Sequence, residues 1–314
     1  MFHAKPDIAG FNLYFHSTNL SSMNFKNYPF LLLLCLPSLF SCVAHRYVYS
    51  APTPNVCYFK ENGDSKLAAY YYEGGGGNSG NNVVGFKNQG YDVQGGYAFN
   101  NKMAITANYS YRSERDSSYN NYDALENKSL VRYIRNQFEI GLASFKFDKN
   151  KKGTTNLAFG FGAGKYKIVE QGTDFDQVTN TLKAYGREIT MPFYKLYIQP
   201  SYNYVDNSYF RFSAGAKANF MYFSNQAGNY LHEEESYWGF DRLNNKLVIF
   251  FEPNFNLQAG LPQYNWIRFE MNLSFILFDL NFPGETLMKK RSGGVSLGLT
   301  FDPVAAFRKS SGNK

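Results

Sequence analysis

The stretch that decides the fold is SYFRFSAGAKANFMYF, residues 208–223, in which two kinds of side chain alternate. One set is apolar, with aromatic rings at both ends and small residues between them: Phe210, Phe212, Ala214, Ala216, Ala218, Phe220 and Tyr222. The other set is polar and carries two cations: Arg211, Ser213, Gly215, Lys217 and Asn219. Successive side chains of a strand point to opposite faces, so this strand separates two different media. An apolar face bracketed by aromatic residues, opposite a polar face, is typical of a strand in a transmembrane barrel.

The same alternation recurs along the chain and predicts about ten strands, with eight or twelve left open. They are expected near residues 66–73, 91–99, 103–112, 131–147, 157–164, 188–205, 208–223, 247–258, 267–277 and 294–301. Short connections at 100–102, 148–153, 206–207 and 260–264 alternate with long ones at 74–82, 114–128, 170–187, 225–245 and 279–290. Short turns at one end and long loops at the other characterise outer-membrane barrels. We therefore predict an all-β, closed antiparallel transmembrane barrel, an up-and-down meander over residues 66–302, followed by a C-terminal tail, 303–314.

Composition narrows the class of protein. The chain has 314 residues and a mean hydropathy of −0.41, which excludes a helical membrane protein. It is rich in rings, with 26 Tyr and 30 Phe, and these residues favour strands and aromatic girdles. The net charge is +7, but the cations are scattered rather than clustered in a stripe, so nucleic-acid binding is not favoured. A soluble, aromatic-rich β-protein is the alternative to the barrel.

The N-terminal region carries the features of an export signal. Residues 29–40, PFLLLLCLPSLF, form an apolar run too short to span a bilayer, and the run ends in Leu39-Phe40-Ser41-Cys42. This ending resembles the lipobox of bacterial lipoproteins, in which cleavage precedes a cysteine that becomes lipidated. We predict a signal peptide over 23–41, lipidation of Cys42 and a translation start at Met23, with 1–22 as a non-native upstream extension. Residues 42–65, with an Ala-Pro-Thr-Pro run, are interpreted as a periplasmic tether.

Taken together, these patterns resemble the small outer-membrane β-barrel proteins of the Bacteroidota that carry a lipoprotein-type signal. The resemblance covers roughly residues 23–302 and rests on pattern, without a specific motif. It implies a location in the cell outer membrane with the N-terminus on the periplasmic side, and it implies no chemistry. The expected partners are outer-membrane lipid, lipopolysaccharide and the barrel-assembly machinery during insertion. The sequence does not identify a ligand of the external loops.

Charged residues on the polar faces are the only concentrated polar feature. They are Arg112, Arg135, Glu139, Lys195, Arg211, Lys217, Glu252, Arg268 and Glu270. A barrel of eight to ten strands has little room once its inward side chains are in place. We therefore predict a network of ion pairs that fills the lumen, and a structural or binding role. The alternative is a narrow channel or transporter for small solutes, because charges at membrane depth are often functional.

A hydrolase with a site in the external loops is a less favoured alternative. Ten-stranded barrels include the omptin proteases, which this chain resembles only in strand count. Among the four histidines, only His232 could serve at the outer rim, beside Glu233–Glu235 and Asp241, and a solvated charge cluster is the favoured explanation of this set. Adjacent glutamates point apart, so metal binding is not expected. We predict no catalytic residue, metal or cofactor.

Overall fold

The computed structural model describes residues 46–74, 83–120, 127–148, 152–176, 179, 181–205, 209–264, 266–282, 288–290 and 293–311. The chain divides into two units, Met1–Ser41 and Cys42–Lys314, and every described residue belongs to the second unit. None of the described helices is long and apolar enough to cross a membrane.

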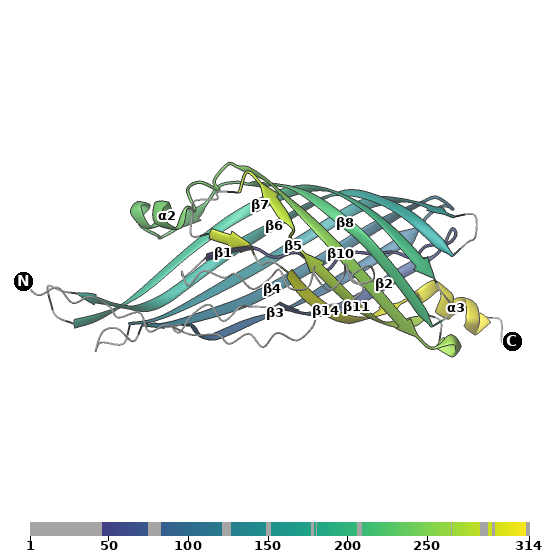
Figure 1. The fold of residues 1–314 in the computed structure, drawn as a ribbon, viewed down its shortest axis with the longest axis horizontal. Helices are drawn as coiled ribbons and strands as arrows, with labels where there is room; N and C mark the ends of the chain where they lie inside the picture. Colours follow the sequence, from purple (N-terminus) through teal and green to yellow (C-terminus); the bar gives the residue numbers. More distant parts are fainter. Residues whose placement is uncertain are drawn as a thin grey trace, which may run out of the picture. The chain divides into compact units, whose positions relative to one another are not determined.

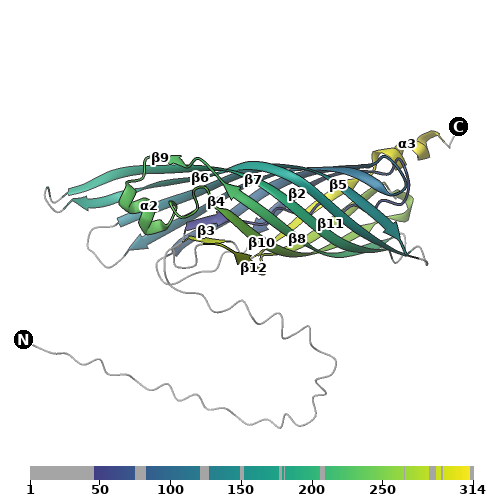
Figure 2. The ribbon, with the colours of Figure 1, turned by 90° about the horizontal axis from the view of Figure 1, so that it is seen from above.

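Ten antiparallel strands form a closed barrel, as predicted (Figures 1 and 2). The strands are β2 (Ser65–Gly74), β3 (Val83–Ala98), β4 (Met103–Asn120), β5 (Asn127–Phe147), β6 (Gly153–Asp176), β7 (Thr181–Val205), β8 (Phe210–Phe223), β10 (Leu247–Gly260), β11 (Ile267–Phe275) and β14 (Gly293–Phe301). Each pairs with the next in this order, and β14 pairs with β2 to close the ring. The meander follows from the alternation itself, because one face of every strand must stay turned inward.

The apolar positions predicted from the alternation face outward around the ring. On β7, for example, Tyr194, Leu196 and Ile198 are exposed, whereas Lys195 and Tyr197 between them are buried. The same division holds on β8, where the rings of Phe210 and Phe212 are exposed and Ser213 is fully buried. The barrel therefore has an apolar outer surface, whereas the outer surface of a soluble barrel is polar. Its interior is filled by side chains.

Several strands run further than their apolar pattern. The polar stretches 114–128 and 170–187 were expected to be loops, but β4 continues to Asn120, β5 starts at Asn127, and β6 and β7 pair as far as Asp176 and Thr181. Backbone ladders need no apolar side chains, so the alternation marks only the part of each strand within the apolar band. The β4–β5 and β6–β7 connections are accordingly shorter than predicted.

The remaining elements lie at the two ends of the barrel. They are β1 (Arg46–Tyr49), β9 (Ala227–Gly228), α2 (His232–Trp238), η2 (Pro262–Tyr264), β12 (Phe278–Leu280), β13 (Met288–Lys290) and α3 (Pro303–Ser311). We call the end with the connections 99–102, 148–152, 206–209 and 261–266 the short-turn end, and the opposite end the long-loop end. Figure 1 shows α2 at one end and α3 at the other.

Residues 46–60 run through the interior of the barrel; we call them the inserted segment. The sequence analysis interpreted them as part of a periplasmic tether, but Val48, Ala51 and Phe59 are almost fully buried. The segment starts beside β13 at the long-loop end and leads into β2 at the short-turn end. Fifteen extended residues can reach roughly 50 Å, enough to cross a hydrocarbon layer of about 30 Å.

Candidate functional site

The inserted segment is anchored at the long-loop end by its first residue. Arg46 is buried, and its Nη2 lies 2.8 Å from Oε1 of Glu170 on β6. Its guanidinium lies 3.7 Å from the centre of the Trp238 ring at the end of α2. Backbone pairing of β1 with β13 adds a parallel ladder from Arg46. A buried, paired arginine under an aromatic ring holds the chain in one position, because leaving would strip Glu170 of its partner.

Next to Arg46, the interior of the barrel toward the long-loop end is apolar. Tyr49 stacks on Phe250 of β10 with ring centroids 4.4 Å apart. The cluster also contains inward-facing residues of β5 to β10 and of the connection after α2, among them Tyr133, Ile168, Met191, Met221, Phe240 and Leu243. Here the inward faces are apolar, so the inserted segment is packed as in the core of a soluble domain. The predicted uniformly polar lumen holds only for the rest of the interior.

The Thr53 region of the inserted segment is held by polar groups of β3 and β4. The backbone N–H and the hydroxyl of Thr53 both donate to Asp92 Oδ2, the former at 3.2 Å. Asp92 also accepts two hydrogen bonds from Arg112, at 2.8 and 2.9 Å. Further on, the Asn55 side chain donates to the backbone oxygens of Gly95 and Ala107. Wall side chains thus replace the ladder partners that an extended chain inside a barrel cannot find elsewhere.

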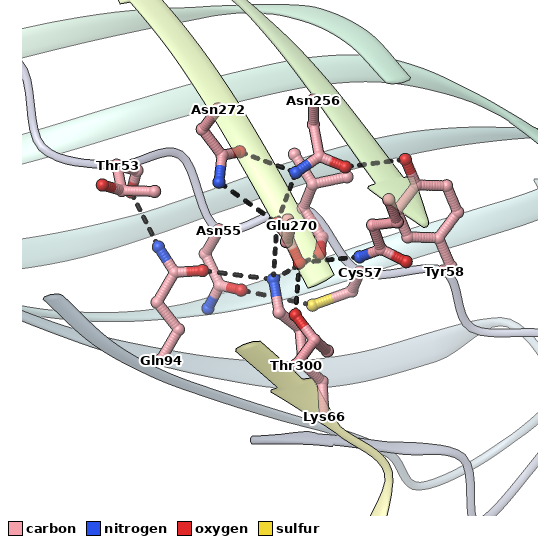
Figure 3. A network of polar contacts seen from close by, with 12 residues as sticks. Thr53, Asn55, Cys57, Tyr58, Lys66, Gln94, Asn256, Glu270, Asn272 and Thr300 are labelled. Atoms are coloured by element: carbon pink, nitrogen blue, oxygen red, sulfur yellow. Dashed lines mark hydrogen bonds and ion pairs between the residues drawn. The ribbon is translucent and has the colours of Figure 1, made fainter. Parts of the chain in front are cut away.

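At the short-turn end, the inserted segment joins a network around Glu270 (Figure 3). Glu270 on β11 accepts hydrogen bonds from Asn256, Gln258 and Thr300. The hydroxyl of Tyr58 donates to Asn256 Oδ1 at 2.8 Å, and Lys66 Nζ donates to the Val56 oxygen at 2.7 Å. Each connection ties the segment to a different strand. Removing one wall residue would therefore leave buried polar groups without a hydrogen-bond partner, both in the inserted segment and in the wall.

Cys57 is buried within this region. Asn156 and Asn203 both donate to its backbone oxygen at 2.9 Å. Its side chain packs in a small cluster with Phe59, Ala98, Ala104 and Phe145. The side chain is buried, so the Cys57 thiol is closed off from solvent.

A separate ion network crosses the middle of the barrel. Glu139 on β5 contacts Lys195 on β7 and lies 2.7 Å from Lys217 Nζ on β8. Strand β6 stands between β5 and β7, and glycines on its inner face make room. A Cβ on Gly162 would come within 3.0 Å of the Lys195 side chain, and one on Gly160 within 2.7 Å of Tyr197. These two glycines of β6 thus allow long side chains to pass over the strand.

The structure places the predicted lumen charges in the interior. All are buried except Arg211, which is partly exposed near the short-turn end. In the structure, Glu139 is in direct contact with Lys195 and Lys217. Arg112 and Arg135 instead pair with two acids outside the predicted set, Asp92 at 2.8 Å and Glu114 at 2.6 Å. Glu114 was missed because it lies in a stretch interpreted as a loop. Arg46 was missed because it lies in the expected tether, and no periodicity marks either position.

The remaining sequence predictions concern His232, metal binding, Cys42 and the signal peptide. His232 is exposed at the start of α2. Within the described part of the chain, no three His, Cys, Asp or Glu side chains are grouped so that they could hold a metal ion. Cys42 lies outside the described residues, as do Met23 and the signal peptide.

No family model and no curated protein matches this sequence. Three solved structures are similar in part: the porin NanC, CarO2 of Acinetobacter baumannii and OmpT of Vibrio cholerae, an outer membrane protein. The NanC match has 10% identity and a TM-score of 0.28, and covers 76% of this chain and 98% of that chain. The CarO2 match has 8% identity and a TM-score of 0.30, and covers 78% and 100%. The OmpT match has 7% identity and a TM-score of 0.22, and covers 76% and 95%. At TM-scores this low, the functional argument rests on the geometry of this chain.

Proposed function

We propose that this protein is an outer-membrane β-barrel closed by its own N-terminal segment, with a structural or binding role. A sheet in lipid must pair all its backbone groups, and this one has no open edge because β14 pairs with β2. The outward apolar side chains supply the surface that lipid requires. Outer-membrane lipid, lipopolysaccharide and, during insertion, the barrel-assembly machinery would be its partners.

The inserted segment is the observation that carries this proposal. It fills the interior from Arg46 to Phe59 and is held by apolar packing, buried hydrogen bonds and an ion pair. A wide permanent pore is incompatible with a chain in this position. The narrow channel would require the segment to leave, and Glu170 would then lose its ion pair with Arg46 and Asp92 its hydrogen bonds from Thr53.

Single-channel recording in planar bilayers tests the proposal. The full chain should show no large stable conductance steps. A variant lacking residues 46–60 should conduct, provided that gel mobility before and after heating shows it to be folded. Large steady steps from the full chain would refute the closed lumen and favour the channel. We further propose that the chain is not an enzyme, so His232→Ala should leave any cellular phenotype of the protein unchanged.

We also propose that Cys42 carries lipid, supported by the lipobox-like sequence that precedes it. The position of Arg46 alters where that lipid would lie. Four residues reach at most about 14 Å, so the lipid would sit near the long-loop end, whereas the sequence predicts an N-terminus on the periplasmic side. Intact mass of the membrane-extracted protein tests the modification: a mature chain without acyl groups, or one cleaved elsewhere, would refute it.

A further inference from the structure

A small pocket lies at the short-turn end, where the inserted segment meets the wall. Tyr58 and Phe59 of the segment line it together with residues of five strands and their flanks. The wall residues are Asp64, Ser65, Lys66, Arg211, Gln258, Trp266, Arg268, Thr300 and Asp302. The pocket therefore exists only while the segment is in place. It has no part in the lumen closure proposed above.

Two arginines face each other across β10 in this pocket. Arg211 of β8 pairs in register with Gln258, and Arg268 of β11 pairs with Gly260, two residues further along the same face of β10. Gly260 lets the Arg268 side chain pass over the strand, because a Cβ there would lie 2.9 Å from Arg268 Nη1. The glycine thus allows a second guanidinium to approach the first.

The acids of the pocket are engaged in local structure. Asp64 Oδ2 accepts the backbone N–H groups of Lys60 and Glu61, at 2.6 and 3.1 Å, and so closes a turn. Asp302 Oδ1 accepts from the Ser65 hydroxyl at 2.8 Å and from the backbone of Ala305, and so caps α3. These contacts leave the carboxylates little freedom to move toward an arginine.

Arg211 lines the same pocket as these acids but forms no ion pair with them among the described residues. Within the part of the chain that the structure describes, its guanidinium makes no hydrogen bond or ion pair, and its Nε is buried without a partner. Its contact is with the Tyr58 ring, 5.5 Å from the ring centre. Burial lowers the pKa of the Lys60 ammonium, and Arg211 and Arg268 lower it further, while Asp64 and Glu61 act in the opposite direction.

We propose that this pocket binds a phosphate-type oxyanion between Arg211 and Arg268. Guanidinium groups donate in pairs to phosphate oxygens, and a tetrahedral anion can accept from two arginines on different strands at once. The pocket is small, so it takes inorganic phosphate or the terminal phosphate of a larger molecule. Either the free anion or a lipid headgroup presents this chemistry.

Calorimetric titration of the full chain in zwitterionic detergent with inorganic phosphate tests the site. Wild type should bind saturably at one site. Arg211→Gln should weaken binding about tenfold or more, the loss expected for a charge-assisted hydrogen bond. The matched control is Arg242→Gln, the same change at an exposed arginine beyond α2, which should bind like wild type. Equal binding by the two variants, or no saturable binding by wild type, would overturn the proposal.

A second measurement needs no variant. At matched ionic strength, phosphate should raise the thermal midpoint of the wild-type barrel more than chloride does, because a ligand that binds the folded state stabilises it. Equal midpoints in the two salts would count against the site. Competition by micellar phosphatidic acid would identify a headgroup as the occupant, whereas free phosphate binding without competition would assign the site to the soluble anion. Conductance reports the lumen and not this pocket, so the two proposals fail separately.

Discussion

At the residue scale, the interior of the barrel contains buried charged side chains that contact side chains of opposite charge. Burying one charge costs several kcal/mol, and an opposite charge in contact offsets that cost. Glu139 offsets two lysines at once, Lys195 and Lys217. The sequence predicted that these three side chains point inward, and the structure brings them together. The sequence could not predict that Glu139 contacts both lysines, because the three residues lie far apart along the chain.

Replacing Glu139 with Gln should therefore destabilise the barrel strongly. The neutral amide removes the carboxylate that both buried ammonium groups contact, and losing one partner of a buried pair costs about 3–5 kcal/mol. The matched control is Glu188→Gln, because Glu188 pairs with Lys167 at 2.7 Å with both side chains largely in solvent. An exposed pair contributes about 1 kcal/mol or less. Guanidinium unfolding in lipid vesicles measures both, and equal losses would contradict the buried network.

At the element scale, the alternation in residues 208–223 gives β8 its two faces. Ala216 lies on the face that carries Phe212 and Phe220, both exposed. Gly215, one position earlier, faces inward, where a Cβ would lie 2.9 Å from the Pro200 oxygen and from Ser201. A shift of one residue would exchange the faces, so the register of β8 is open to a direct test.

Ala216→Arg should destabilise the barrel by roughly 2–4 kcal/mol, the cost of a cation at the middle of the lipid layer. Ala216→Leu is the control, because it adds apolar surface toward lipid and should cost much less. Unfolding in vesicles compares the two. A cysteine at 216 should also react with a lipid-partitioning probe and poorly with a charged thiol reagent. Ready reaction with the charged reagent would mean that β8 is turned over, and a soluble β-protein would be the better interpretation.

Strand ends were less predictable than strand faces. Strands β6 and β7 pair as far as Asp176 and Thr181, well into a stretch interpreted as a loop. Past the apolar band, water can contact both faces, so the alternation disappears while the ladder continues. Lys195 and Tyr197, which pass over the glycines of β6, come from the next strand, so this close packing is visible only in the structure.

At the scale of the whole molecule, the two ends of the barrel are distinct and can be tested for orientation. In outer-membrane barrels the longer connections face outward. Leu231 and Leu261 are exposed to a similar extent, 66% and 61%, at the long-loop and short-turn ends respectively. On intact cells, a membrane-impermeant thiol reagent should label Leu231→Cys and should label Leu261→Cys only after the outer membrane is permeabilised. The reverse pattern would invert the proposed orientation.

The sequence by itself determined which faces of the strands turn outward, that there are about ten strands and that neighbours in the chain pair. These features follow from a period of two and from short connections, which are local properties. Only the tertiary structure decided what fills the barrel. Residues 46–60 have no periodic pattern, and the groups that hold them are distant: the Cys57 oxygen accepts from Asn156 and Asn203, 99 and 146 residues away. An extended segment with two prolines suits a solvated tether and a buried insert equally well, because neither depends on a regular ladder of internal hydrogen bonds. Whether the segment is a tether or an insert depends on polar side chains of distant strands, which come close to the segment only when the sheet closes into a barrel.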